Sequence, residues 1–215
     1  MKELPRRLWH IFAGLALSIA GLLSPRAIFL PVVIAITIAA LVVEIVRLRS
    51  PLVNRRFAVI FQVLLRQKEA VTLTGSAYFL IAASIVFVLC DKSIAAMALT
   101  FVSVGDPIAG MIGEKWGRLR VDPDRMKMSD FAKFPPRLVF RGKKGKSLEG
   151  SSACLVACLA AGAILSVVTH VSLWVVVAGA LSATIVESLF VLVDDNLSVP
   201  LVTVGVMTLV NAAMV

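Results

Sequence analysis

Acidic residues occur inside strongly apolar segments of this chain, where an ionised carboxylate is costly. Asp106 and Glu187 lie within such segments, and Asp194 and Asp195 lie at the end of the segment that holds Glu187. An ionisable residue at membrane depth costs roughly 2.5–3.5 kcal/mol on insertion scales and is a functional candidate by default. Hard carboxylate oxygens suit Mg²⁺ ions that bridge phosphates. The sequence therefore predicts a metal site formed by Asp106, Glu187, Asp194 and Asp195.

The dipeptide Asp106-Pro107 interrupts one of the apolar segments. Proline has no backbone N–H to donate, and Asp-Pro is a favoured pair at the start of a helix. We therefore expect a broken helix whose second half starts at Asp106. The alternative is a proline kink in which Asp106 bonds to a neighbouring helix. The spacing of Gly110, Gly113 and Gly117 then leaves one bare helix face for close approach of backbone or ligand.

A lysine-rich segment precedes the apolar segment that starts at Ser151. Lysines, glycines and hydroxyl groups before a helix N-terminus form an anion site from backbone N–H groups and the helix dipole. The segment is not a P-loop, because that motif requires glycine at the position of Phe140. A basic stop sequence beside the membrane is the alternative. The segment runs from Lys143 to Ser152 and includes Lys144, Lys146, Ser147, Glu149, Gly150 and Ser151.

The polar residues after Glu187 also have a purely structural interpretation. Asn196 or Ser198 could cap a helix that has Pro200 in its first turn. Capping explains one of these residues and leaves the carboxylates unexplained.

Other reactive side chains give weaker signals. His10 follows Arg6-Arg7 at the start of the first apolar segment and could carry a proton or contact a phosphate. The alternative is a structural histidine at the membrane interface. Cys154 and Cys158 share a helix face within an apolar segment, and we expect them to be small packing residues.

The apolar segments that carry these residues are long enough to be membrane helices. The chain has 215 residues, 59% of them hydrophobic, and a mean hydropathy of +0.94, whereas soluble domains are about 45–50% apolar. We predict an all-α polytopic membrane protein, a single domain over residues 1–215, with about seven transmembrane helices. The expected spans are Leu8–Leu23, Ala27–Val46, Leu73–Cys90, Ser93–Gly113, Ser151–Val168, Val171–Val193 and Val199–Val215.

The lysines and arginines indicate the orientation of these spans. Of 22 basic residues, only Arg26 and Lys92 fall on the side opposite the N-terminus. The positive-inside rule therefore places the N-terminus and the long loops at about 47–72 and 114–150 in the cytosol. The candidate site residues all fall on this cytosolic side. The protein is expected in the cytoplasmic membrane if it is prokaryotic.

The two long loops differ in their expected structure. Arg47 to Thr72 is a basic amphipathic segment, predicted to lie in the interface plane, with an ordinary linker as the alternative. Its apolar stripe consists of Phe57, Ile60, Phe61, Leu64 and Leu65. The part of the second loop from Val121 to Pro136 is expected to be irregular.

The formal net charge of +9 does not indicate nucleic-acid binding. The basic residues lie in loops between apolar segments, and no groove-reading motif is present. A basic surface beside a membrane serves anionic lipid head groups and nucleotide phosphates equally well.

Five motifs follow one another along nearly the whole chain. They are Pro5-Arg6-Arg7-x-x-His10-x-x-x-Gly14, Thr74-Gly75-Ser76-Ala77-Tyr78-Phe79, Gly105-Asp106-Pro107-x-Ala109-Gly110-x-x-Gly113, Lys146-Ser147-Leu148-Glu149-Gly150-Ser151 and Asp194-Asp195-Asn196-Leu197-Ser198-Val199-Pro200. Together they resemble the CTP-dependent polyprenol and lipid kinase family, which includes dolichol kinase, phytol kinase and CTP-dependent diacylglycerol kinase. The last two motifs are the specific ones, and the stretch from Val121 to Phe140 is longer than the family pattern.

The resemblance implies transfer of the γ-phosphoryl group of CTP to the hydroxyl of a membrane lipid alcohol, with Mg²⁺ on the triphosphate. Polyprenol or dolichol, phytol and diacylglycerol remain open as acceptors, and so does the oligomeric state. The expected catalytic residues are Asp106, Lys146, Asp195 and His10, and either a carboxylate or His10 takes the proton of the hydroxyl. The nucleotide contacts that the resemblance implies are Lys143, Lys144, Lys146, Ser147, Glu149, Gly150, Ser151, Gly110, Gly113 and Asn196, with Lys115 and Arg118 of second rank.

Two other classes of function are weighed against this one. The related phosphatidate cytidylyltransferases share a lysine-rich Glu-Gly segment, but their C-terminal His-Gly-Gly and Asp-Arg-x-Asp signature is missing here. A CDP-lipid synthase is therefore the alternative. A small ion-coupled transporter would need polar positions that continue from Asp106 and Glu187 toward the outer side, and these are scarce.

Overall fold

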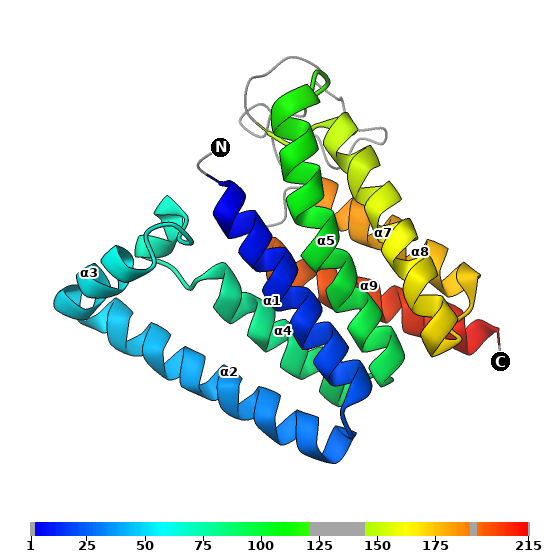
Figure 1. Ribbon diagram of the computed structural model, residues 1–215, viewed down its shortest axis with the longest axis horizontal. Helices are drawn as coiled ribbons and strands as arrows, with labels where there is room; N and C mark the ends of the chain where they lie inside the picture. Colours follow the sequence, from blue (N-terminus) through cyan, green and yellow to red (C-terminus); the bar gives the residue numbers. More distant parts are fainter. Residues whose placement is uncertain (1–2, 121–144, 190–192, 215) are drawn as a thin grey trace, which may run out of the picture.

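The computed structural model describes residues 3–120, 145–189 and 193–214. Each of the seven predicted spans corresponds to a helix within these ranges (Figure 1). The elements are α1 (Leu4–Leu23), α2 (Arg26–Arg49), α3 (Pro51–Ile60), the 3₁₀ helix η1 (Gln67–Ala70), α4 (Gly75–Leu89), α5 (Lys92–Trp116), α7 (Leu148–Thr169), α8 (Leu173–Ser188) and α9 (Asp195–Ala213). The predicted all-α fold is confirmed for the described residues. The prediction for Val121 to Pro136 lies outside them.

Four of these helices, α2, α5, α7 and α9, are long and apolar enough to cross a membrane, and α4 and α8 are shorter apolar helices. Helix lengths and composition therefore support an integral membrane protein.

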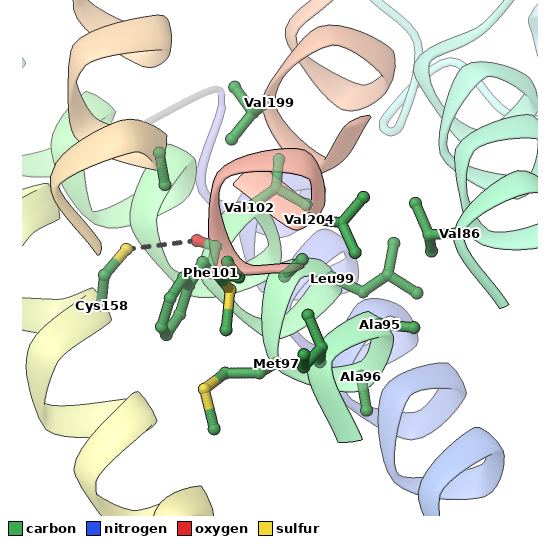
Figure 2. Close-up of a cluster of buried hydrophobic side chains, with 14 of the residues drawn as sticks. Val86, Ala95, Ala96, Met97, Leu99, Phe101, Val102, Cys158, Val199 and Val204 are labelled. Atoms are coloured by element: carbon green, nitrogen blue, oxygen red, sulfur yellow. Dashed lines mark hydrogen bonds between the residues drawn. The ribbon is translucent and has the colours of Figure 1, made fainter. Parts of the chain in front are cut away.

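Helix α5 is the centre of the bundle and packs against α1, α7, α8 and α9 (Figure 1). Every residue from Ile94 to Ser103 is buried, and most of them are apolar, as expected of a central helix. Met97, Leu99 and Phe101 have no exposed surface (Figure 2). The Phe101 ring fits between neighbouring helices because Gly162 and Gly179 have no side chain: a Cβ at either glycine would lie 2.9 Å from the ring.

Cys154 and Cys158 are packing residues, as expected. Both thiols are buried and free, and they lie against Gly105 of α5. The Sγ atom of Cys158 is 3.5 Å from the Phe101 carbonyl oxygen (Figure 2).

The predicted break at Asp106 is wrong, because α5 is continuous through Pro107 to Trp116. A proline inside a helix removes one backbone hydrogen bond and costs about 3 kcal/mol. The packing of α5 between α1 and α7 opposes that loss, so the helix is not divided.

The end of span six and the start of span seven also differ from the prediction. Helix α8 ends at Ser188 and α9 starts at Asp195, four residues before the predicted Val199. Asp194 caps α9, since its side chain accepts a hydrogen bond from the Asn196 backbone N–H at 3.2 Å. The alternative interpretation, in which Asn196 or Ser198 supplies the cap, therefore names the wrong residue, although a cap is present.

Helices α1 and α2 pack on different partners. α1 packs on α5, whereas α2 packs on α4 and α3, and α1 and α2 barely touch each other beyond the loop that joins them (Figure 1). Helix α3 forms the part of the predicted amphipathic segment from Pro51 to Ile60. That this segment lies in the interface plane stays a prediction.

Candidate functional site

A cavity of about 790 Å³ lies where α2, α5 and α8 end and α1, α4, α7 and α9 begin. Small-molecule sites typically measure about 300–1,000 Å³. The cavity brings together candidate residues that are far apart in the sequence. His10, Asp106, Lys146, Glu187 and Asp195 all line it.

Lys146 forms ion pairs with two of these residues. Its Nζ lies 2.9 Å from Oδ2 of Asp195 and 3.2 Å from Oε1 of Glu187, and it also donates to the backbone carbonyl of Glu187. Burial lowers the pKa of Lys146, but the carboxylates of Glu187 and Asp195 outweigh burial and hold this pKa above its usual range. Lys146 is therefore a fixed cation at neutral pH.

Three of the four predicted metal ligands line the cavity: Asp106, Glu187 and Asp195. The Oε2 atom of Glu187 is buried and has no hydrogen-bond partner among the described residues. Within the same ranges, no three acidic, histidine or cysteine side chains converge closely enough to hold a metal ion by themselves. Mg²⁺ commonly takes one or two carboxylates together with substrate phosphates and water, so this donor set suits an ion that arrives with a nucleotide.

Asp194, the fourth predicted metal ligand, is engaged elsewhere. Its Oδ2 lies 3.1 Å from Nζ of Lys68 and 3.5 Å from a guanidinium nitrogen of Arg66, and its Oδ1 accepts from Asn196. Burial raises the pKa of Asp194, but Lys68 and Arg66 outweigh burial and lower it. Asp194 thus connects the start of α9 to residues 66–68 through ion pairs.

The lysine-rich segment provides the start of α7 and one wall of the cavity. Lys146, Ser147, Gly150 and Ser151 line the cavity. Ser147 is also the helix cap, because its Oγ accepts from the Gly150 backbone N–H at 3.1 Å. Asn196, at the start of α9, lines the same cavity. Lys143 and Lys144 lie outside the described residues.

Several predicted nucleotide contacts are placed away from the cavity. Oε1 of Glu149 accepts from the Arg118 backbone N–H at 2.9 Å and from the Leu119 N–H at 3.2 Å, so it joins two chain segments. Lys115 is exposed, with its Nζ 4.6 Å from the centroid of the Trp116 ring.

Gly110 and Gly113 belong to the cavity wall and also allow close packing. A Cβ at Gly110 would lie 3.0 Å from the Arg7 guanidinium, and a Cβ at Gly113 would lie 2.7 Å from Oγ of Ser147. The glycine face of α5 therefore mainly allows Arg7 and α7 to pack closely against this helix.

His10 lies at the cavity edge on α1. Its ring meets the Phe79 ring edge-on, with centroids 5.6 Å apart. Its Nε2 is buried and has no hydrogen-bond partner among the described residues. This nitrogen could therefore accept or donate a proton in a ligand-bound protein.

Arginines on the cavity wall were only partly predicted. Arg6, Arg7, Arg66 and Arg120 line the cavity, and Arg7 forms an ion pair with Glu114. Arg120 donates to the Gly145 carbonyl at 3.1 Å and forms an isolated β-bridge with Ser147. Sequence motifs pointed to Arg6 and Arg7, whereas no signal distinguished Arg66 and Arg120 from other loop cations.

A buried ionic network beside the cavity was not predicted either. Arg47 has no exposed surface, and its guanidinium lies 2.5 Å from the Glu44 carboxylate and donates to the carbonyls of Glu69 and Thr72. Glu44 also accepts from the Thr74 hydroxyl at 2.9 Å, and Glu69 accepts from the Gly75 N–H at 3.0 Å. The signal that was available is Glu44 itself, an acidic residue within an apolar segment and three positions from an arginine.

Besides α1, three further helices have their N-termini at the cavity wall. Residues at the starts of α4, α7 and α9 line it, namely Gly75, Gly150 and Asn196. Helix N-termini carry a partial positive charge and attract phosphates and other anions. The cavity thus combines fixed cations and helix dipoles with a set of carboxylates.

Comparison with known proteins gives two matches, both to proteins named CTP-dependent diacylglycerol kinase 1. The protein from Eremothecium gossypii is 27% identical over 157 residues, which are 72% of this chain and 43% of that protein. The one from Schizosaccharomyces pombe is 27% identical over 155 residues, which are 72% of this chain and 62% of that protein. The chain is related to the CTP-dependent lipid kinases.

The relationship confirms the resemblance predicted from the five motifs. The chain spans about half the length of the curated relatives that it matches. No protein-family profile matches the chain, and no solved structure matches it.

Proposed function

We propose that this protein is a CTP-dependent lipid kinase that phosphorylates the hydroxyl of a membrane lipid alcohol, with diacylglycerol as the first acceptor to test. We further propose that α1, α2, α4, α5, α7, α8 and α9 all span the membrane, with the N-terminus and the cavity on the cytosolic side. The observation that carries the proposal is the cavity at one end of apolar helices, which joins Lys146, three carboxylates and three helix N-termini.

The cations of the cavity are suited to a triphosphate. Phosphoryl transfer is catalysed mostly by positioning and by electrostatic stabilisation of the transferring group. Lys146 is the central cation of the cavity. Other parts of the cavity wall carry Arg6, Arg7, Arg66 and Arg120. The starts of α4, α7 and α9 add backbone dipoles to the same volume.

Asp106, Glu187 and Asp195 are the residues that would hold Mg²⁺. The ion would neutralise charge on the β- and γ-phosphates. Glu187 and Asp195 are paired with Lys146 in the protein as described, so each carboxylate has a counter-charge before any ligand binds.

The reaction itself moves one phosphoryl group and one proton. The acceptor hydroxyl oxygen forms a bond to the γ-phosphorus, the bond between that phosphorus and the β–γ bridging oxygen breaks, and CDP leaves. The hydroxyl proton passes to a base on the cavity wall, for which Asp106, Asp195 and His10 are the candidates.

The test is a phosphorylation assay on membranes that contain the protein, with CTP labelled at the γ-phosphate, Mg²⁺ and diacylglycerol. We expect labelled phosphatidate from the wild type. Lys146→Ala should lower the rate by about 10²-fold or more, the usual effect of removing one electrostatic contact in a catalytic site. Asp106→Asn, which keeps the shape of the side chain, should also lower it strongly.

Lys92→Ala is the matched control, because Lys92 is an exposed lysine at the opposite end of the bundle. Its rate should equal that of the wild type. A CDP-linked lipid product would overturn the kinase proposal in favour of a cytidylyltransferase. Full activity of Lys146→Ala would show that the site is elsewhere.

A further inference from the structure

The cavity has a second, apolar part on the side formed by α1, α2, α4 and the segment after α3. Its lining there includes Trp9, Val43, Phe61, Leu64, Leu65 and Leu80, which we call the apolar arm. The acidic residues on this side are engaged with the protein: Glu3 with Arg6, Glu44 with Arg47 and Thr74, and Glu69 with the backbone N–H groups of Arg66 and Gly75. The arm is therefore suited to a hydrocarbon.

The arm is open to the surroundings of α1 and α2. These two helices barely touch, because each packs on a different neighbour (Figure 1). Trp9 on α1 and Val43 on α2 line the cavity and yet remain 48% exposed each. Most of α2 is apolar and exposed in the same way. In a membrane, the medium at this opening is lipid hydrocarbon.

We infer that the lipid acceptor enters the cavity from the bilayer between α1 and α2 and keeps a hydrocarbon chain in the apolar arm. This inference rests on the proposed function, and it adds the route and the chain subsite. The arm and the polar cluster belong to one cavity, so a chain in the arm directs the attached hydroxyl toward Asp106 and Lys146. The nucleotide has no need of the apolar side chains of the arm, because Lys146, Arg120 and the starts of α7 and α9 on the other walls match its phosphates.

Val43→Trp tests the inference by filling the arm from α2. The indole should exclude the lipid chain and lower kcat/KM for diacylglycerol by at least about tenfold, the scale of discrimination in a hydrophobic subsite. The affinity for CTP, measured by calorimetry in detergent, should stay unchanged.

Val42→Trp is the matched control, since Val42 is the preceding residue, is 53% exposed and is not part of the cavity lining. We expect wild-type kcat/KM from this variant. Thermal unfolding of both variants in detergent should show equal stability, which separates a blocked arm from a misfolded protein. Equal loss of kcat/KM in both variants, or none in either, would overturn the inference.

Photolabelling tests the same subsite without catalysis. Diacylglycerol with a diazirine in one acyl chain should label peptides from the N-terminal half of α1, the C-terminal half of α2 and the segment 57–65. Labelling confined to α7 and α8 would overturn the inference while leaving the kinase proposal intact. Absence of phosphatidate in the wild-type assay, with the arm still labelled, would instead overturn the kinase proposal.

Discussion

Arg47 and Glu44 connect the end of α2 to the chain segment that leads into α4. The guanidinium binds the carbonyls of Glu69 and Thr72 as well as the Glu44 carboxylate. This segment carries Arg66 and Lys68, which pair with Asp194 at the start of α9. The buried pair therefore helps to fix one wall of the cavity, although Arg47 itself does not line it.

Replacement of Arg47 by methionine should strongly destabilise the protein. The change leaves the Glu44 carboxylate buried without its counter-charge, and breaking a buried ion pair costs about 3–5 kcal/mol. Thermal unfolding in detergent measures the effect. The double variant Glu44→Gln/Arg47→Met should recover part of the loss, because no charge is then left unpaired.

Arg49→Met is the control, since Arg49 lies on the same helix, two positions further on, and is exposed. It should unfold as the wild type does. Equal stability of Arg47→Met and Arg49→Met would show that the buried network contributes nothing.

Charge inside or beside apolar segments made most of the charged residues on the polar side of the cavity predictable. Asp106, Lys146, Glu187 and Asp195 do share one cavity, as their positions at corresponding helix ends indicated. Arg47 and Glu69 were not predictable in the same way, because a charged residue at the end of a membrane span normally faces water or head groups. Their burial depends on how the segment after α3 folds back, which no local pattern encodes.

At the scale of elements, the contact between α5 and α7 is unusually close near the site. A Cβ at Gly150 would lie 2.7 Å from the carbonyl oxygen of Ala109 on α5. Small residues at a helix–helix contact let two backbones approach, which is a common solution in membrane proteins. This contact sets the position of Lys146 relative to Asp106.

Gly150→Ala should separate α5 from α7 and destabilise the protein by about 1–3 kcal/mol, the usual range for overpacking. The added methyl group meets backbone rather than a flexible side chain, so the helices must move. Gly205→Ala offers a matched change inside α9, where an added Cβ meets nothing within 4 Å.

The control should be neutral or stabilise the protein by up to about 1 kcal/mol, because alanine is the better helix former. Unfolding temperatures of the two variants, measured in one detergent, give the comparison. A Gly150→Ala protein that is as stable as Gly205→Ala would mean that the close contact is not required.

The helices themselves were largely predictable, because a membrane span needs a long apolar segment. The two places where the helices differ from the sequence interpretation concern polar residues that the sequence alone interprets locally. Asp-Pro at 106–107 is a good helix start in isolation, but the packing of α5 on both sides keeps the helix whole. Asp194 rather than Asn196 caps α9, and the cap is supported by Lys68, a residue 126 positions away in the sequence.

At the scale of the whole molecule, two helices are shorter than a bilayer. α4 has 15 residues and α8 has 16, which at 1.5 Å per residue are about 22 Å and 24 Å long, against a hydrocarbon core of about 30 Å. α4 begins at the cavity, and α8 ends there. The cavity therefore reaches below the membrane surface on the side that we propose to be cytosolic.

The proposed topology predicts which cysteines can be labelled from each side. In a variant without Cys90, Cys154 and Cys158, a cysteine at Arg55 should react with an impermeant maleimide only from the cytosolic side. A cysteine at Lys92 should react only from the opposite side, since both residues are exposed and lie at opposite ends of the bundle. Labelling of intact cells and inverted vesicles distinguishes the sides, and reaction of both cysteines from one side would refute the seven-span arrangement.

The opening between α1 and α2 also determines which concentration of the lipid acceptor controls its binding to the protein. A lipid that arrives through this opening comes from the surrounding bilayer. Its effective concentration is therefore its mole fraction among the other lipids. Adding inert lipid or detergent dilutes the acceptor in the bilayer or micelle, even when the amount of acceptor per volume of buffer is constant. The Michaelis constant for the acceptor is then a surface quantity, whereas that for the nucleotide remains an ordinary molar concentration.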